Sequence, residues 1–209
     1  MRWRARDGRP TTAADLSFHY DSIGRSGVID QTLSIRNRGS SAVALRLTFA
    51  PLDANGQELP GLTTTTAYGT DSGRHIIPAR FTDIDVLAFQ GPGFRDVADV
   101  RVQVEQVEEV PFPAKIRDVV LTDRIDSRGN VVGGGEYAQV RLTNPSREPV
   151  PVRVALLEYE DPPPGRSQQA VNVQDLGGLV TVPGRGTTTI PGPTTFPDAF
   201  VSVKAYFSR

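Results

Sequence analysis

The amino-acid sequence predicts an all-β protein built as two tandem antiparallel β-sandwich domains related by internal duplication. Three observations support this fold class. The segment around Asn37 recurs around Asn144 without a gap, at a constant offset of 107 residues (144 − 37 = 107). Short segments that alternate apolar and polar residues lie between turn signals spaced by about 8 to 12 residues. No segment has a convincing helical period, so the pattern is typical of a sandwich.

The two copies match position by position, with apolar residues at the same alternate positions on either side of a turn. Leu33, Ile35, Val43, Leu45, Leu47 and Phe49 correspond to Val140, Leu142, Val150, Val152, Val154 and Leu156. The offset is about half of the 209-residue length, so each half is large enough to bury its own core. We assign residues 1–12 to an N-terminal segment, 13–107 to the first domain, 108–114 to a linker and 115–209 to the second domain.

Period-two alternation defines most strands of the first domain. Turn formers occupy residues 37–40, and we expect the strands on either side of them to form an antiparallel pair. Residues 53–56 form the next turn, where Asn-Gly favours the positive φ angles of a tight hairpin. The threonine-rich residues 62–68 form an edge strand or a long loop. Residues 97–107 fit a strand or a helical face, and we favour a strand because valine prefers extended backbone. The other expected strands are 16–20, 29–36, 43–49, 76–77 and 81–89.

The linker is expected to be short and stiff, because prolines on both sides of Phe112 exclude a helix. In the second domain, residues 161–165 replace the Asn-Gly turn with a proline-rich segment that should project as a loop. We interpret Asn37 and Asn144 as turn residues rather than ligand contacts. The expected strands of this domain are 119–121, 137–142, 150–156, 179–182, 187–190 and 200–206.

Composition excludes several classes of function. The formal charge is −1, with 23 basic and 24 acidic residues, so no overall field attracts nucleic acid, and we expect no nucleic-acid partner. Cysteine is absent, which removes disulfides, thiolate metal sites and cysteine nucleophiles. No apolar run is long enough for a transmembrane helix, so no membrane insertion is expected within the chain.

Catalytic chemistry at neutral pH usually begins with histidine, and the chain has only His19 and His75. His19 lies on the polar side of an alternating segment, and His75 follows Gly73 and Arg74, so we expect both at the surface. No serine and acid are placed to complete a triad with either of them. We therefore predict no catalytic residue, no metal ligand and no cofactor, and we predict that the protein is not an enzyme.

Residues 35–43, together with residues 45–47 and 53–56, resemble the central hairpin of small bacterial Ig-like or fibronectin III-like sandwich modules. Residues 141–150 are similar. The resemblance covers two hairpins and, weakly, the closing strands. It implies a module that acts outside the cytoplasmic membrane, as a spacer or as an adhesive or partner-binding domain. The motif is generic, so no functional residue is carried over from these modules.

The leading functional prediction is a non-enzymatic protein-interaction or spacer module, the extracytoplasmic part of a bacterial surface or envelope protein. Arg46 and Arg153 occupy equivalent outward-facing positions and are candidate partner contacts, because arginine is enriched at interfaces. Glu158 and Glu160 share one face of a strand and Tyr159 lies on the other. These three residues complete the candidate partner-binding set.

Two alternative functions belong to other classes. A carbohydrate-binding module requires coplanar exposed aromatic rings on one face, and the candidates are Tyr68, Tyr137, Tyr159 and Phe94. A structural subunit of a particle, filament or phage surface would use the sandwiches as packing units.

Overall fold

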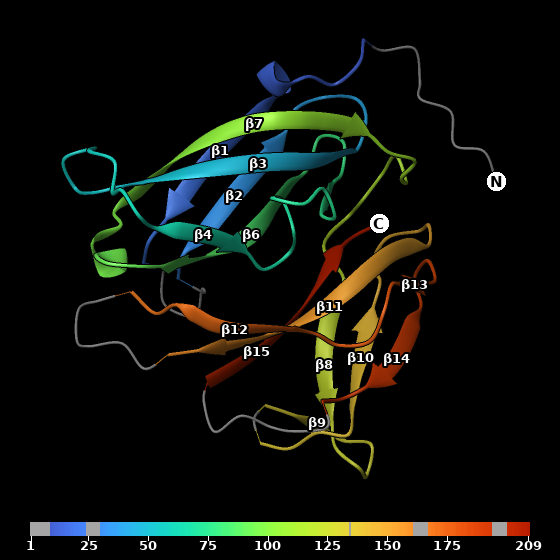
Figure 1. The fold of residues 1–209 in the computed structure, drawn as a ribbon. Coiled ribbons are helices and arrows are strands. Elements are labelled where there is room, and N and C mark those ends of the chain that lie inside the picture. Colours follow the sequence, from blue (N-terminus) through green and yellow to red (C-terminus); the bar gives the residue numbers. More distant parts are fainter. Residues whose placement is uncertain (1–8, 24–29, 134, 161–166, 194–199) are drawn as a thin grey trace.

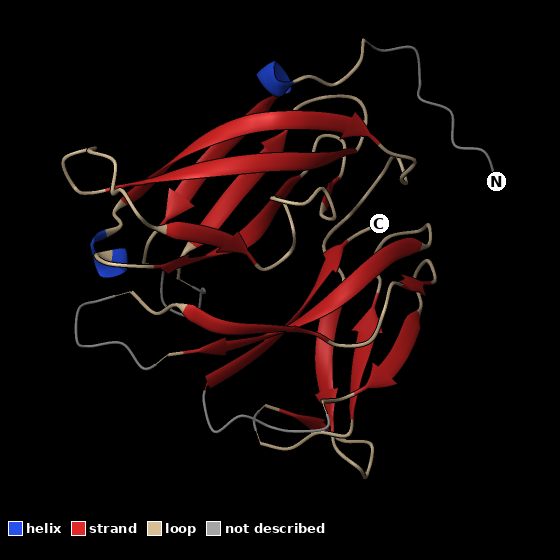
Figure 2. Ribbon diagram, viewed as in Figure 1, coloured by secondary structure: helices blue, strands red, loops and turns tan. Residues whose placement is uncertain are grey.

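The computed structural model describes residues 9–23, 30–133, 135–160, 167–193 and 200–209. Figure 2 shows that strands dominate the fold, and the only described helical turns are the 3₁₀ segments η1 (Ala13–Asp15) and η2 (Phe94–Asp96). All strand pairs are antiparallel. The predicted all-β class with antiparallel sheets is confirmed.

The first domain packs two sheets face to face, in the upper half of Figure 1. One sheet has the order β1-β2-β6-β4 and the other the order β5-β3-β7. Their strands are β1 (Leu16–Asp21), β2 (Thr32–Asn37), β3 (Val43–Leu52), β4 (Thr63–Thr66), β5 (Ile76–Ile77), β6 (Thr82–Gln90) and β7 (Asp99–Glu109).

The second domain repeats the central part of this arrangement. One sheet has the order β14-β10-β8-β9, and in the other β11 pairs with β12, β13 and β15. Its strands are β8 (Leu121–Ile125), β9 (Val131–Val132), β10 (Gln139–Thr143), β11 (Val150–Tyr159), β12 (Ala170–Asp175), β13 (Val180–Val182), β14 (Thr187–Pro191) and β15 (Phe200–Phe207). β10 lies between β8 and β14 as β2 lies between β1 and β6.

Asn37 shows why the first repeated turn forms. Its side-chain Nδ2 donates to the carbonyl oxygens of Ser41 (2.9 Å) and Ile77 (3.2 Å), and its Oδ1 accepts the N–H of Gly39 (2.8 Å). The side chain is fully buried, so these bonds replace backbone pairing that the turn cannot make for itself. One asparagine thus joins the β2–β3 turn to the end of β5.

Asn144 makes the same three bonds in the second domain. Its Nδ2 donates to the carbonyl oxygens of Glu148 (2.9 Å) and Val182 (3.2 Å), and its Oδ1 accepts the N–H of Ser146 (2.8 Å). It is also buried. The interpretation of both asparagines as turn residues is confirmed, and the two turns are equivalent in hydrogen bonding as well as in sequence pattern. The expected antiparallel pairing across these turns is wrong, because β2 and β10 lie in one sheet of their sandwich and β3 and β11 lie in the other.

Several expectations about individual elements are settled by the strand assignment. The threonine-rich segment is the edge strand β4, and the valine-rich segment is the strand β7 rather than a helix. The strands β9 and β12 were not expected from the sequence. β4 and β12 follow equivalent strands, β3 and β11, in the two domains. β4 pairs with β6 whereas β12 pairs with β11, so the two strands join opposite sheets of their sandwiches. The predicted loop at residues 161–165 lies outside the described residues.

The buried apolar side chains form three clusters rather than two. One fills the first sandwich, around Leu33, Leu45 and Leu87. The second fills the other sandwich and also takes in Ile76 from the first domain and Phe112 from the linker. The third lies between the domains and consists of Ala67, Tyr68, Val86, Ala155, Leu157, Tyr159, Ala170 and Tyr206. The two sandwiches therefore share buried surface, which sequence alone did not indicate.

Candidate functional site: the junction between the two sandwiches

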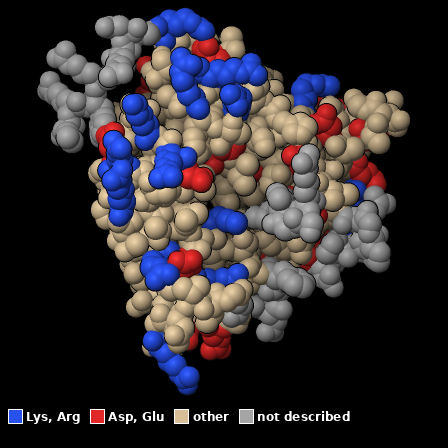
Figure 3. Space-filling view, turned by 180° about the vertical axis from the view of Figure 1, so that it is seen from behind, with Lys and Arg blue, Asp and Glu red and all other residues tan. Residues whose placement is uncertain are grey.

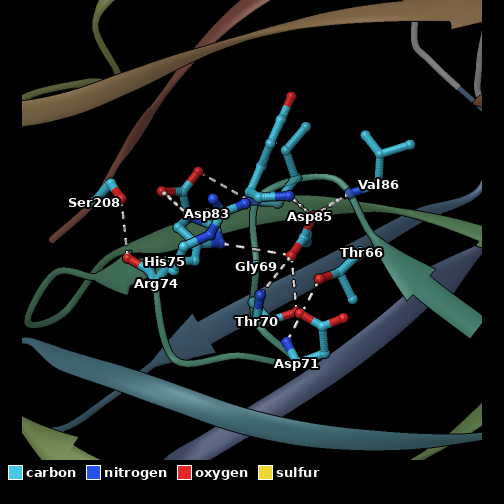
Figure 4. A network of polar contacts seen from close by, with 12 residues as sticks. Thr66, Gly69, Thr70, Asp71, Arg74, His75, Asp83, Asp85, Val86 and Ser208 are labelled. Atoms are coloured by element: carbon cyan, nitrogen blue, oxygen red, sulfur yellow. Dashed lines mark hydrogen bonds and ion pairs between the residues drawn. The ribbon is translucent and has the colours of Figure 1, made fainter. Parts of the chain in front are cut away.

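The contact between the domains is built around a buried histidine and two buried carboxylates (Figure 4). His75 lies immediately before β5, while Asp83 and Asp85 lie on β6. Alternation along a strand places both aspartates on the face of β6 that carries Leu87, a residue of the first core. The exposed fractions of His75, Asp83 and Asp85 are 0%, 5% and 0%, so the charges are removed from solvent.

His75 is held by both carboxylates. Its Nε2 lies 3.2 Å from Asp83 Oδ2, within hydrogen-bond distance, and its Nδ1 lies 3.9 Å from Asp85 Oδ2. A buried cation requires compensating negative charge, because transfer from water to the protein interior costs several kcal/mol per ion. The arrangement therefore favours a protonated imidazole between two carboxylates.

Asp85 is surrounded by four donors. Its Oδ1 accepts the N–H groups of Tyr68 (2.8 Å) and Val86 (2.8 Å). Its Oδ2 accepts the N–H (3.2 Å) and the hydroxyl (2.8 Å) of Thr70. A carboxylate accepts at both oxygens, whereas a protonated acid would place its own hydrogen against one of these donors. Asp85 thus fixes the loop between β4 and β5 against β6.

The pKa values of the cluster follow from competition between burial and neighbouring charge. Burial lowers the pKa of His75, but the hydrogen bond and charge of Asp83 and the charge of Asp85 outweigh this effect and raise that pKa above its ordinary value. Burial raises the pKa of Asp85, against the lowering effects of His75, Thr70 and Tyr68. Both groups therefore bind protons more tightly in the folded state than in the unfolded chain.

The cluster predicts a specific dependence of stability on pH. A group with a raised folded-state pKa stabilises the fold fully below its unfolded pKa, which is about 6.5 for histidine, and loses this contribution as pH rises through the folded pKa. We expect the free energy of unfolding to fall at alkaline pH in the native chain and to fall less in His75→Gln. Urea titrations of both proteins at about pH 6 and at higher pH measure this difference. Parallel pH profiles would contradict the protonated state of His75.

Aromatic stacking connects this cluster to the second domain. The rings of Tyr68 and Tyr206 stack with centroids 4.7 Å apart and an angle of 13° between their planes. His75 meets both rings edge-on, at 5.7 Å from Tyr68 and 5.8 Å from Tyr206. Burial of each tyrosine contributes roughly 2 kcal/mol by its apolar area, and pair geometry adds about 1 kcal/mol. The loop before β5 and the strand β15 are thereby locked together.

The segment after β15 returns to the first domain and bonds to the loop before β5. Ser208 forms a β-bridge with His75, and its hydroxyl donates to the carbonyl oxygen of Arg74 (3.2 Å). Arg209 Nε donates to the carbonyl oxygen of Gly73 (2.7 Å). These bonds use main-chain atoms of the first domain, so they depend on backbone position rather than on side-chain identity there.

A second set of contacts joins the other end of the junction. Gln169 Oε1 accepts the N–H of Phe89 (2.9 Å), and Arg95 Nη2 lies 3.0 Å from Glu160 Oε2. A cavity of about 340 Å³ adjoins these residues and is also lined by Phe94. The domains are therefore held at both ends of their contact, which opposes rotation about either one.

Gln31 adds a strained residue to this end. It is buried at 1% exposure and has a φ of 57°, in the left-handed region that non-glycine residues rarely adopt. Its side-chain oxygen accepts from the Tyr20 hydroxyl, and its Nε2 donates to Ser167 Oγ (2.7 Å) in the second domain. The bond between domains offsets part of the strain, which costs about 1 kcal/mol.

The candidate arginines lie in different surroundings despite their equivalent strand positions. Arg46 is exposed on β3. Arg153 on β11 is partly buried opposite Tyr206, and its Nε is buried without a hydrogen-bond partner among the described residues. The structure does not bring the two together as one outward-facing surface.

The three candidates at residues 158–160 lie in different surroundings. Tyr159 is 5% exposed and belongs to the cluster between the domains, so its prediction as a surface contact is wrong. Glu160 is engaged by Arg95. Glu158 is partly buried and accepts a hydrogen bond from Asn172 Nδ2 (3.3 Å). Of the three residues, it is the one that remains a candidate for contact with a partner.

The aromatic candidates for sugar binding are mostly buried. Tyr68, Tyr137 and Tyr159 are exposed by only 3%, 4% and 5%, and Phe94 is partly buried. The expectation that these rings form an exposed platform is wrong for the three tyrosines. Tyr68 and Tyr159 pack in the cluster between the domains, and Tyr137 packs in the core of the second sandwich.

The histidine expectations had opposite outcomes. His19 is a surface residue, with a side chain 76% exposed, as predicted. His75 was expected at the surface and is fully buried. Asp83 and Asp85 were missed because their segment was interpreted by its apolar residues alone. The sequence feature that could have identified them is a pair of acidic residues at alternate positions, on the strand face that also carries Leu87.

Among the described residues, no group of three or more histidine, cysteine or acidic side chains is arranged to hold a metal ion. In the same part of the chain, no helix is long and apolar enough to cross a membrane. Comparisons of the chain with protein-family models, with curated proteins and with solved structures found no match.

Proposed function

We propose that the chain is a rigid, non-enzymatic spacer and protein-interaction module that acts outside the cytoplasmic membrane of a bacterium. The observation that carries this proposal is the buried junction, in which Tyr68, His75 and Tyr206 join the two sandwiches. We also infer that the sandwiches arose by duplication. The matching hydrogen bonds of Asn37 and Asn144 support that origin.

The junction supports a spacer role because it removes the usual freedom between neighbouring domains. Domains in one chain move relative to each other by default, unless their interface is large and apolar. Here an apolar cluster, a buried ionic group and bonds at both ends act together. A module of this kind holds its two outer ends at a fixed distance and orientation.

The polar groups of the junction support the non-enzymatic half of the proposal. His75 is enclosed by Asp83, Asp85 and two tyrosine rings, and its role is accounted for by charge balance. A general base must reach a substrate proton within hydrogen-bond distance, and a residue with no exposed surface offers no such approach.

The distance between two spin labels tests the rigidity. The chain has no cysteine, so Gln103→Cys on β7 and Thr181→Cys on β13 introduce two unique labelling sites at exposed positions. We expect one narrow distance distribution, which Tyr206→Ala broadens because the ring stack is lost. Tyr137→Ala, which removes an equally buried ring away from the junction, is the matched control and should leave the distribution narrow.

A broad distribution in the native chain would overturn the spacer proposal. Turnover of the purified chain on a panel of hydrolase substrates, lost in Asp85→Asn while the fold is retained, would overturn the non-enzymatic half.

A further inference from the structure

Three exposed arginines converge at one end of the second domain. The Arg117 N–H donates to Ser146 Oγ (3.0 Å), the Arg185 N–H donates to the Ser146 carbonyl oxygen (2.7 Å), and Arg147 follows Ser146 in the chain. They come from three separate segments: the linker end, the β13–β14 turn and the β10–β11 turn. None of the three has an ion-pair partner among the described residues.

Two more exposed arginines lie at the equivalent end of the first domain. The Asn37 N–H donates to the Phe81 carbonyl oxygen (2.9 Å), which brings the β5–β6 turn with Arg80 beside the β2–β3 turn with Arg38. Neither arginine pairs with a carboxylate in the part of the chain that the structure describes.

The linker joins these two ends. The Val110 N–H donates to the Ala42 carbonyl oxygen (3.0 Å) beside the first turn, and Arg117 is bonded at the second turn. Arg117 is seven positions after Val110 (117 − 110 = 7), so the two anchor points lie at most about 25 Å apart. Lys115 is exposed in the segment between the two anchor points. We call the resulting set the arginine strip, and it consists of Arg38, Arg80, Lys115, Arg117, Arg147 and Arg185. Figure 3 shows basic side chains along the same side of both domains, the side of the linker in Figure 1.

The strip gathers basic side chains without carboxylate partners among the described residues, although the chain is almost neutral overall. Several arginines outside the strip face carboxylates at 2.5 to 3.6 Å, and these are Arg9, Arg74, Arg95, Arg101, Arg141 and Arg209. Their acidic partners are thereby neutralised, whereas the arginine strip keeps its positive charge. The acidic residues next to the strip in the chain are Glu109, Asp118 and Glu148, and the six basic groups outnumber them, so the local field of the strip is positive even though the formal charge is −1.

Backbone strain supplies an independent observation. Arg80 and Arg185 have φ angles of 56° and 52°, in the left-handed region. They occupy the same position of the β5–β6 and β13–β14 turns. Glycine adopts this conformation freely, while a residue with a Cβ pays about 1 kcal/mol there. Folding does not explain arginine at both positions, and a role for the exposed guanidinium groups does.

We propose that the arginine strip binds an extended acidic segment of a protein partner. Guanidinium groups match carboxylates in paired hydrogen bonds, and an anchor spacing of up to about 25 Å suits a chain rather than a single anion. A protein is favoured over nucleic acid or sugar because the described residues of the strip and its surroundings offer no free ring for stacking. Its nearby rings, Phe81 and Phe112, pack against Phe207. This inference rests on the proposed interaction function and names its surface.

The double variant Arg80→Gly and Arg185→Gly tests the proposal. Binding of labelled poly-L-glutamate is measured by fluorescence anisotropy at about 20 mM salt, where screening is weak. We expect the native chain to bind, and the double variant to bind about 10-fold more weakly. Its stability in urea should be unchanged or higher, because glycine relieves the left-handed strain. A purely structural role for these arginines predicts the opposite, namely lower stability with unchanged binding.

The matched control is Arg128→Ala with Lys204→Ala, which removes the same charge from exposed basic residues outside the strip. We expect less than about a twofold change in binding for this control. An equal loss in the control, or no binding of poly-L-glutamate by the native chain, would overturn the proposal. Stronger binding to polyphosphate or to anionic lipid vesicles than to poly-L-glutamate would also overturn it. The spin-label distance is independent of these outcomes, so the failure of this inference is distinguishable from the failure of the spacer proposal.

Discussion

Asp85→Asn is expected to lower the free energy of unfolding by about 3 to 5 kcal/mol, which is the largest effect of any single isosteric change in the junction. The asparagine side chain has one acceptor oxygen, so its NH₂ group must face two of the donors that now bond to the carboxylate of Asp85. The substitution also removes one of the two negative charges that balance His75. Urea unfolding at about pH 6 measures the loss.

Asp71→Asn is the control for this change. Asp71 is exposed in the same loop, close to Thr70 (Figure 4), so the same chemical substitution should alter stability by less than about 0.5 kcal/mol. A loss below about 1 kcal/mol in Asp85→Asn would mean that the buried carboxylate does not hold the loop.

Asn37→Asp and Asn144→Asp should each lower stability by about 3 kcal/mol or more, and by similar amounts. In both turns the Nδ2 group donates to two carbonyl oxygens, and a carboxylate oxygen at that position would face both of them without a hydrogen. Both side chains are buried, so water cannot relieve the repulsion. Chemical denaturation of the two variants measures the losses side by side.

The exposed Asn55 provides the comparison, because Asn55→Asp makes the same change at the surface and should cost less than about 0.5 kcal/mol. A large loss in only one of the two buried variants would show that the turns are not energetically equivalent, despite their matching bonds.

Local pattern was sufficient for the parts of the fold that are repeated. Alternation between turn formers located β2, β3, β10 and β11 and the turns between them, and the equivalence of Asn37 and Asn144 followed from their offset. The expected pairing of the strands across each turn was wrong, because the turn connects the two sheets of a sandwich. The strands and turns are predictable because alternation and turn chemistry depend on neighbouring residues. The choice of strand for β7 also held, because a valine-rich segment favours extended backbone.

Sheet membership was not predictable in the same way. β12 pairs with β11, while β4 pairs with β6, although the two strands follow the equivalent strands β11 and β3 in the chain. A strand alternates identically whichever sheet it joins, so the choice depends on tertiary packing. β9 was missed because a pair of residues is too short to show a period.

The junction was missed for a related reason. Alternation indicates which residues share a face of a strand, but it does not indicate what covers that face. Tyr68 and Tyr159 were therefore expected at the surface, whereas the second sandwich and the first bury them against each other. His75 became a core residue only because the segment after β15 returns to it. The partners of these residues are distant in the chain, so no local pattern indicates them.

Calorimetric unfolding of the native chain tests the central claim that the junction makes the two sandwiches one unit. The account predicts a single transition whose calorimetric and van't Hoff enthalpies agree, because neither domain can unfold without exposing Tyr68, Tyr206 and the buried ionic group. Two separate transitions, with one domain remaining folded after the other has melted, would contradict it.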